Sequence, residues 1–270
     1  MSKLEKLQKL NRALLEERRG LQAQADQFPV EEAAQRRLLR SLMNTRQPIP
    51  PPAGFLALQD EVLGAEREEK GVVAADALPA AAAHPQIALW QGDITRLRAD
   101  AIVNAANSAL LGCFCPCHGC IDNAIHSAAG LQLREACNRL MEAQGLPEPT
   151  GRAKLTKGYN LPARYVLHTV GPIIRGKVTE RDREKLASCY RSCLELAAEN
   201  GLETVAFCCI STGEFHFPNR EAAEIAVSTV KQSLQTPTSI RKVIFNVFKD
   251  TDAEIYRGLL GENGTAEGSP

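Results

Sequence analysis

The sequence has no excess of charge of either sign. It contains 32 Lys and Arg residues against 32 Asp and Glu residues, so its formal net charge at pH 7 is zero. Binding to nucleic acid through bulk electrostatics needs a basic surface. The balanced composition argues against such a surface overall, with a local basic patch as the alternative left open, and we therefore expect no nucleic-acid partner.

Long apolar runs are also missing. No stretch of about 18 apolar residues occurs, as a membrane-spanning helix would need, and the charged opening MSKLEKLQKLNRALLEERRG lacks the apolar segment of a secretion signal. We expect no membrane association and a location in the reducing cytoplasm. The nine cysteines are odd in number and clustered, so metal binding is a better interpretation of them than disulfide bonds.

Residues 1–80 are predicted to form a helical extension. Leucines at near-helical spacing in a charged background predict helices up to about residue 46, and Pro29 is expected to open the second one. The proline-rich segment 46–54 should break this pattern, and a short helix is expected over 56–70. Because no motif occurs here, we expect packing or interaction from the extension and no chemistry.

From residue 81 the pattern changes to short β-branched runs that alternate with helical segments, which predicts an α/β domain over 81–262. The strands are apolar on both sides, as in a largely parallel sheet covered by helices on both faces. Strands are expected at 87–91, 101–105, 153–156, 165–170, 204–210 and 242–248, and helices at 123–144, 180–199, 219–235 and 252–260. The polar tail 263–270 is expected to be disordered.

The segment LLGCFCPCHGCIDNAIH holds four cysteines and a histidine within eight residues. Thiolates and an imidazole are ligands that suit Zn²⁺. A structural zinc site usually draws four ligands from two separated pairs, whereas a single cluster most easily supplies three and leaves a position open. A carboxylate, Asp122, follows at once and indicates chemistry. The haem motif CxxCH is absent, and the alternative interpretation is an oxidation-prone thiol cluster.

Three polar loops follow predicted strands. STGEFHFPN (211–219) joins a strand to a helix, where free backbone N–H groups bind phosphate, although an ordinary loop has the same pattern. Asp93 in QGDI could accept from an amine or from ribose hydroxyls, or could cap a turn, and the asparagines of NAAN (104–107) are common turn formers. Ligands bind beyond the carboxyl ends of parallel strands, so the three loops would form one cleft.

Other residues are open to two interpretations. His168, inside an apolar strand, is expected to be a hydrogen-bonded core histidine. His126 could orient Asp122 or simply pack, and Phe248 could stack on a base or belong to the core.

Together these segments resemble the macrodomain family. The resemblance runs from about residue 87 to residue 260 and rests on QGDITRLRADAIVNAANSALLG, CIDNAIHSAAG, GRAKLTKGYNLPARYVLHTVGP and CISTGEFHFPNREAAEIA, in the family's order and spacing. It implies a three-layer α/β/α fold with a mixed, mostly parallel sheet. It also implies ADP-ribose binding, and many macrodomains hydrolyse ADP-ribose from proteins.

The segment GCFCPCHGC stands where most macrodomain hydrolases carry a glycine-rich loop. It is similar to the zinc-dependent, sirtuin-associated branch, which also bears an N-terminal helical extension. The branch pattern C-F-x-P-x-H-x-C implies Cys113, His118 and Cys120 as zinc ligands. Cys115 and Cys117 fall at variable positions, where they are either incidental or compete for the metal.

The resemblance also implies roles for individual residues. Asn107 would bind ribose hydroxyls near the scissile bond, and Ile121 and Asp122 would face the same ribose. The residues implied around the adenine are Asp93, Ile94 and Phe248. Those implied around the diphosphate and proximal ribose are Ser211, Thr212, Gly213, Glu214 and Phe215. His216 stands where many macrodomains have glycine, which leaves the local shape of this loop open.

These roles predict zinc-dependent hydrolysis of mono-ADP-ribose from modified proteins, with Asp or Glu esters as the linkage. We expect zinc to position the substrate and polarise an oxygen, with Asp122 and Asn107 as the catalytic side chains. The branch resemblance implies a sirtuin-type transferase and a lipoyl-type carrier protein as partners. The alternatives are hydrolysis of O-acetyl-ADP-ribose, a non-catalytic ADP-ribose reader and a redox sensor built on the thiols.

Overall fold

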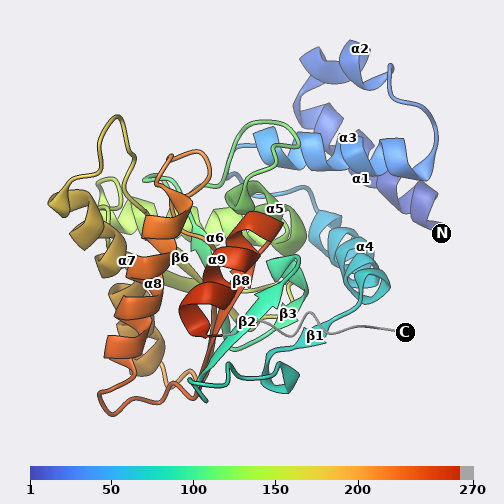
Figure 1. Ribbon diagram of the computed structural model, residues 1–270. Coiled ribbons are helices and arrows are strands. Elements are labelled where there is room, and N and C mark those ends of the chain that lie inside the picture. Colours follow the sequence, from blue (N-terminus) through green and yellow to red (C-terminus); the bar gives the residue numbers. More distant parts are fainter. Residues whose placement is uncertain (262–270) are drawn as a thin grey trace.

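The structure is a computed structural model that describes residues 1–261 (Figure 1). The tail 263–270, predicted to be disordered, lies outside these residues. Within them, no helix is long and apolar enough to cross a membrane.

A six-stranded mixed sheet forms the centre of the larger part of the molecule. Its strand order is β2-β8-β7-β4-β6-β5, and every neighbouring pair is parallel except β5 and β6. The strands are β2 (Ile87–Gln91), β4 (Ala101–Ala105), β5 (Ala153–Lys157), β6 (Tyr165–Thr169), β7 (Thr204–Phe207) and β8 (Lys242–Val247). Strands β4 and β7 have every side chain buried or nearly so, because helices cover both faces of the sheet.

Two layers of helices enclose this sheet. One layer contains α7 (Glu180–Glu199), α8 (Asn219–Ser233) and α9 (Asp250–Leu260), which pack side by side. The other contains α5 (Ile121–Ala129) and α6 (Leu131–Gln144), which contact β4 and β5 (Figure 1). The predicted three-layer α/β fold with a mixed, mostly parallel sheet and N-terminal helices is confirmed.

The predicted helix over 123–144 is two helices that meet at Gly130. This glycine has a φ of +96°, and a Cβ at this position would lie 2.5 Å from the side-chain nitrogen of Gln59. The Gln59 oxygen accepts a hydrogen bond from Leu131 N, the first residue of α6. The break therefore depends on a residue 71 positions away in the sequence, which periodicity does not reveal.

Two further elements differ from prediction. Strand β7 ends at Phe207 instead of residue 210, since the chain already turns toward Ser211, whose φ is +66°. A small parallel sheet of β1 (Val73–Ala74) and β3 (Leu97–Arg98) was not predicted, because two residues a strand give no periodicity.

The N-terminal helices pack around an apolar core of their own. They are α1 (Lys3–Glu17), α2 (Gln22–Ala25), α3 (Glu32–Thr45) and α4 (Phe55–Lys70). Helix α3 begins after Glu31 and not at Pro29 as predicted, while its apolar side is buried as predicted. Leu131 at the start of α6 joins this core, so the extension is packed onto the α/β part beside α5 (Figure 1).

Candidate active site and metal centre

The three loops predicted to form a cleft follow parallel strands of the central sheet. Asp93 follows β2, Asn107 follows β4, and the segment 211–215 follows β7. The carboxyl ends of parallel strands lie at one edge of a sheet. These loops therefore lie on the same edge, which is the geometry the cleft needs.

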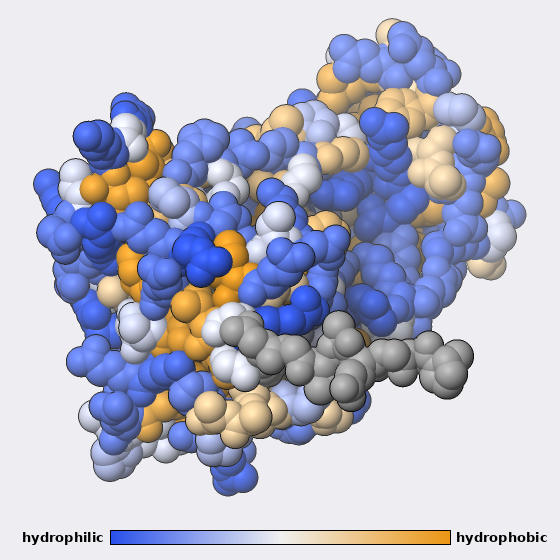
Figure 2. All heavy atoms as spheres, in the orientation of Figure 1, coloured by the Kyte–Doolittle hydropathy of each residue, from blue (hydrophilic) through white to orange (hydrophobic). Residues whose placement is uncertain are grey.

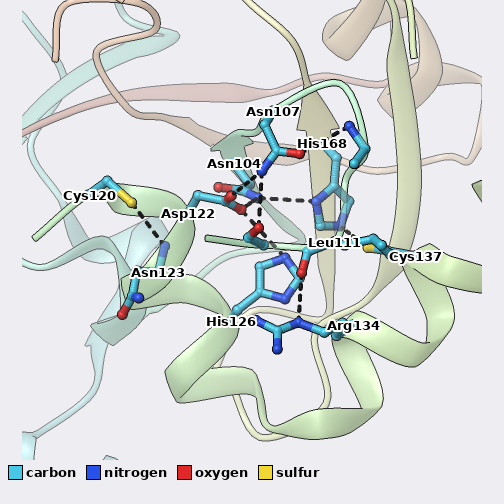
Figure 3. Close-up of polar contacts among 12 residues, drawn as sticks. Asn104, Asn107, Leu111, Cys120, Asp122, Asn123, His126, Arg134, Cys137 and His168 are labelled. Carbon is cyan, nitrogen blue, oxygen red and sulfur yellow. Dashed lines mark hydrogen bonds and ion pairs between the residues drawn. The ribbon is translucent and has the colours of Figure 1, made fainter. Parts of the chain in front are cut away.

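Asp122 is a buried carboxylate held by two amide groups (Figure 3). Its Oδ1 accepts a hydrogen bond from Asn104 Nδ2 at 2.8 Å, and its Oδ2 accepts one from Asn107 Nδ2 at 3.3 Å. Burial raises the pKa of Asp122 to about 6, although the hydrogen bond from Asn104 acts in the opposite direction. The carboxylate, near the start of α5, is thus fixed in place by Asn104 in β4 and by Asn107 in the loop after it.

His168 supports Asn104 from behind, as Figure 3 shows. The amide nitrogen of Asn104 lies 3.2 Å from His168 Nδ1, which therefore accepts, and the proton resides on Nε2, 2.9 Å from the hydroxyl of Thr156. Burial lowers the pKa of His168 to about 3, so the ring is neutral. The prediction of a hydrogen-bonded core histidine is confirmed.

His126 is also buried, one turn of α5 after Asp122. Its Nε2 lies 3.5 Å from Asp122 Oδ1, but within the described part of the chain neither ring nitrogen makes a hydrogen bond. Burial and the neighbouring His168 lower the pKa of His126 well below its usual value. His126 is therefore a neutral ring packed against the carboxylate, and Gly112 passes close to its other side.

Three side chains lie close together just before the N-terminus of α5, and they are Cys113, His118 and Cys120. One ligand atom of each lies within 4.8 Å of the other two. The Nδ1 atom of His118 is buried without a hydrogen-bond partner in residues 1–261. Burial and the adjacent Cys113 raise the pKa of the Cys120 thiol to about 12. Metal binding to a thiol releases its proton, and two cysteine sulfurs with one imidazole at this spacing are a donor set that fits Zn²⁺.

The other two cysteines of the loop lie apart from this group. Cys115 is exposed. Cys117 has a φ of +52° and donates through its sulfur to the carbonyl of Arg37 on α3. Neither is within the three-residue group.

The loop after β7 has an unusual backbone. Ser211 and His216 both have positive φ values, +66° and +57°, a region that glycine occupies most easily. The local backbone conformation that the sequence left open at His216 is thus left-handed, although this residue is not glycine. Ser211 is buried and its hydroxyl has no hydrogen-bond partner in the described chain, whereas Gly213 and Glu214 are exposed.

The remaining residues implied around the ligand lie near these loops. Asp93 caps the short turn 94–96, because its Oδ1 accepts hydrogen bonds from the backbone N–H and from the hydroxyl of Thr95. The next residue, Ile94, is buried. Ile121 begins α5, directly before Asp122. Phe248 is 76 % exposed, so the alternative that it belongs to the core is wrong. Its contact with adenine stays a prediction.

Several residues that shape this site were given no role on the basis of the sequence. Asn123 joins the loop to α5 by donating through its backbone to Cys120 Sγ and through its amide to the Cys115 carbonyl. Arg134 of α6 donates to the Leu111 carbonyl at 2.6 Å (Figure 3). Its guanidinium also lies over the ring of Phe114. A polar residue on an amphipathic helix has no sequence signature for such a role.

Comparisons with known proteins identify relatives of this chain. The Macro domain family model matches residues 103–226. A protein-ADP-ribose hydrolase from Treponema medium is 51 % identical over 236 residues, which cover 87 % of this chain and 90 % of that protein. A probable bifunctional ADP-ribose hydrolase/ADP-ribosyltransferase from Fusarium oxysporum f. sp. cubense is 43 % identical over 259 residues, which cover 89 % of this chain and 43 % of that protein.

A solved structure is similar as well. The crystal structure of the Trypanosoma brucei macrodomain in complex with ADP-ribose is 34 % identical and superposes with a TM-score of 0.63, covering 82 % of this chain and 95 % of that one. The sequence identity, the shared fold and the loops at one edge of the sheet lead to one conclusion: this chain belongs to the Macro domain family.

Proposed function

We propose that this protein is a zinc-dependent hydrolase that removes mono-ADP-ribose from modified proteins. The observation that carries the proposal is the position of Asp122. It is a buried carboxylate, held by Asn104 and Asn107, only two residues after Cys120 of the candidate metal group. Names of relatives that hydrolyse ADP-ribose from proteins support the same reaction class.

In this proposal the cleft binds ADP-ribose along the edge of the sheet. Asp93 accepts the adenine amino group, with Ile94 beside it. Asn107 and Ile121 contact the distal ribose. The diphosphate lies against the loop after β7, where backbone N–H groups are natural donors to an anion, and the residues assigned to it are Ser211, Thr212, Gly213, Glu214 and Phe215.

The residues that would hold zinc are Cys113, His118 and Cys120. When bound, zinc would supply Lewis-acid polarisation of a substrate oxygen. Asp122 orients the attacking water, and its two amide partners keep the carboxylate aimed in one direction. Asn107 already donates to this carboxylate at 3.3 Å, and in this proposal it also binds a ribose hydroxyl.

The substrate we propose is an ester between the ribose and an Asp or Glu side chain. Ester hydrolysis needs an oriented water and stabilisation of a developing negative charge. It does not need the pair of carboxyl groups that most glycoside hydrolases use. One buried carboxylate beside a cation site suits the ester better.

The partners we propose are a sirtuin-type ADP-ribosyl transferase and a lipoyl-type carrier protein that receives the modification. Support for the transferase comes from the Fusarium oxysporum relative, whose name joins the two activities in one chain. Support for the carrier is the resemblance of the cysteine loop to the sirtuin-associated branch. The cytoplasm remains the predicted location.

The test is a comparison of substrates with the purified protein. We expect ADP-ribose release from a protein modified on Asp and Glu to be faster than deacetylation of O-acetyl-ADP-ribose. Faster deacetylation would make the small ester the substrate. Firm ADP-ribose binding without turnover of either substrate would make the protein a reader and contradict the proposal.

A further inference from the structure

Helix α3 of the extension makes direct polar contacts with the loop that carries the candidate metal ligands. Arg40 donates from Nη2 to the backbone carbonyl of His118 at 3.0 Å. Its Nε and Nη2 also donate to Oδ1 of Asn123, at 3.1 and 2.6 Å. One side chain of the extension is therefore bound to both the loop and α5.

Asn44 makes a second connection one turn further along α3. This side chain is buried, accepts from the backbone N–H of Cys117 at 2.9 Å and donates to the hydroxyl of Ser127 on α5 at 3.0 Å. Residues four apart lie on the same face of a helix. Arg40 and Asn44 thus present one polar face of α3 to the loop.

Asn123 relays these contacts to a ligand. Its backbone N–H donates to Cys120 Sγ at 3.4 Å, and its amide donates to the Cys115 carbonyl at 3.0 Å. Its Oδ1 accepts from Arg40 and from Ser127. Arg40 therefore contacts the side chain of the residue whose backbone N–H donates to the Cys120 sulfur, and the same side chain holds the Cys115 carbonyl of the loop.

The loop needs such support because its backbone has little of its own. No helix or strand occurs between β4 and α5, and Cys117 takes a left-handed φ without being glycine. Bringing three ligand atoms within 4.8 Å requires this segment to be ordered. If contacts with α3 already order this loop when the protein folds, metal binding does not have to offset the conformational entropy that is lost on ordering it.

The same face of α3 also borders the hollow between the extension and the α/β part. Arg36 and Arg40 line a cavity that reaches Asp93 and Thr95, and the groove outside it continues to Cys117. Figure 2 shows hydrophilic residues along this hollow. The extension thus borders both the loop, at Cys117, and the residues that follow β2, at Asp93 and Thr95.

We propose that Arg40 and Asn44 are positioning residues for metal binding, which hold the loop 113–120 in the conformation that brings its three ligands together. The extension is then a working part of the metal centre and not only a packing partner. This inference rests on the proposed zinc site. Partners of metal ligands that lie one contact further out commonly change metal affinity 10–100-fold when removed.

The test uses the full chain and two separate variants, Arg40→Met and Asn44→Ser. Zinc affinity is measured by competition with a chromogenic chelator, and ligand geometry by the absorption spectrum of the cobalt-substituted protein. We expect each variant to bind zinc about 10–100-fold more weakly and to show altered cobalt bands. Arg40→Lys, which keeps a donor, should recover part of the affinity.

Arg37→Met is the matched control, because Arg37 is an exposed arginine of the same helix whose contact with the loop is through its backbone carbonyl. It should leave both readouts unchanged. Wild-type affinity and cobalt bands in both test variants would overturn the positioning role. If the unaltered chain binds no zinc, the proposed zinc site itself fails, and this role fails with it.

Discussion

At the scale of single residues, Asp122 has the most constrained environment in the site. Asn104 in β4 and Asn107 in the loop after β4 donate to its oxygens. His126 packs beside it, and His168 contacts the amide of Asn104. The sequence identified Asp122 and Asn107 through the family resemblance. It did not identify the support from Asn104, because asparagines near the carboxyl end of a strand are common turn formers, whereas Asn104 lies inside β4.

Replacing this carboxylate should separate chemistry from binding. In Asp122→Ala we expect turnover of the Asp- and Glu-modified protein to fall about 10²–10⁴-fold, since a positioned acid–base group contributes on that scale. ADP-ribose affinity, measured by calorimetry on the same preparation, should change far less. Equal losses in both quantities would assign Asp122 to binding instead.

The buried His168 should make stability depend on pH. Its folded pKa is lowered to about 3 from an unfolded value near 6.5. Between these values the unfolded state binds a proton that the folded state does not, so this contribution to stability is present above about pH 6.5 and is lost as the pH falls. The loss is about 1.4 kcal/mol for each pH unit.

We expect His168→Asn to be less stable than the unaltered chain at pH 7, because the hydrogen bond to Thr156 is lost. Its free energy of unfolding should, however, fall less steeply between pH 6.5 and pH 4. Denaturant titrations across this range give both slopes. Identical slopes would mean that His168 is not a neutral buried ring.

At the scale of elements, the strands and long helices follow from the sequence because their patterns are local. The apolar runs predicted at 87–91 and 101–105 form strands at those residues, and the one predicted at 165–170 forms a strand over 165–169. The break at Gly130 and the short end of β7 do not follow, since they depend on Gln59 and on the turn at Ser211. Contacts between distant segments decide these boundaries, and one sequence does not show them.

The contact between the end of β6 and the loop after β7 gives a prediction of this scale. A Cβ at Gly171 would lie 2.0 Å from Ser211 Oγ and 2.9 Å from a methyl carbon of Ile210. We expect Gly171→Ala to destabilise the protein by about 1–3 kcal/mol, as overpacking does, and to weaken ADP-ribose binding by displacing Ser211. Melting temperature and calorimetry measure the two effects.

Gly176→Ala is the matched control, because a Cβ at Gly176 meets no atom within 4 Å. This variant should keep both its stability and its affinity. Equally tight binding of ADP-ribose by Gly171→Ala and by the control would contradict the claim that Ser211 and its loop contact the ligand.

At the scale of the whole molecule, the extension and the α/β part are joined by buried polar groups as well as by apolar packing. Arg134 is 4 % exposed and donates to the carbonyls of Leu111, Met43 and Arg46. Burial lowers its pKa to about 10, so the guanidinium stays charged at neutral pH. Arg134 of α6 thus connects the segment that leads into the loop 113–120 to the end of α3.

Removing this connection should be costly. We expect Arg134→Met to destabilise the protein by about 3–5 kcal/mol, because buried carbonyls lose their donor and each unsatisfied group is expensive. Arg139→Met on the same helix, whose side chain is 61 % exposed, should change stability by less than about 0.5 kcal/mol. Similar effects for the two variants in chemical denaturation would contradict the bridging role.

The central claim is that zinc in this site is needed to release ADP-ribose from protein. The most direct measurement follows that release from an Asp- and Glu-modified substrate before zinc removal, after it and after zinc is added back, with His118→Ala in parallel. We predict activity that falls with zinc, returns with it and is lost in His118→Ala together with zinc occupancy. Full activity in protein verified to be free of zinc would contradict the account and leave the chemistry to Asp122 alone.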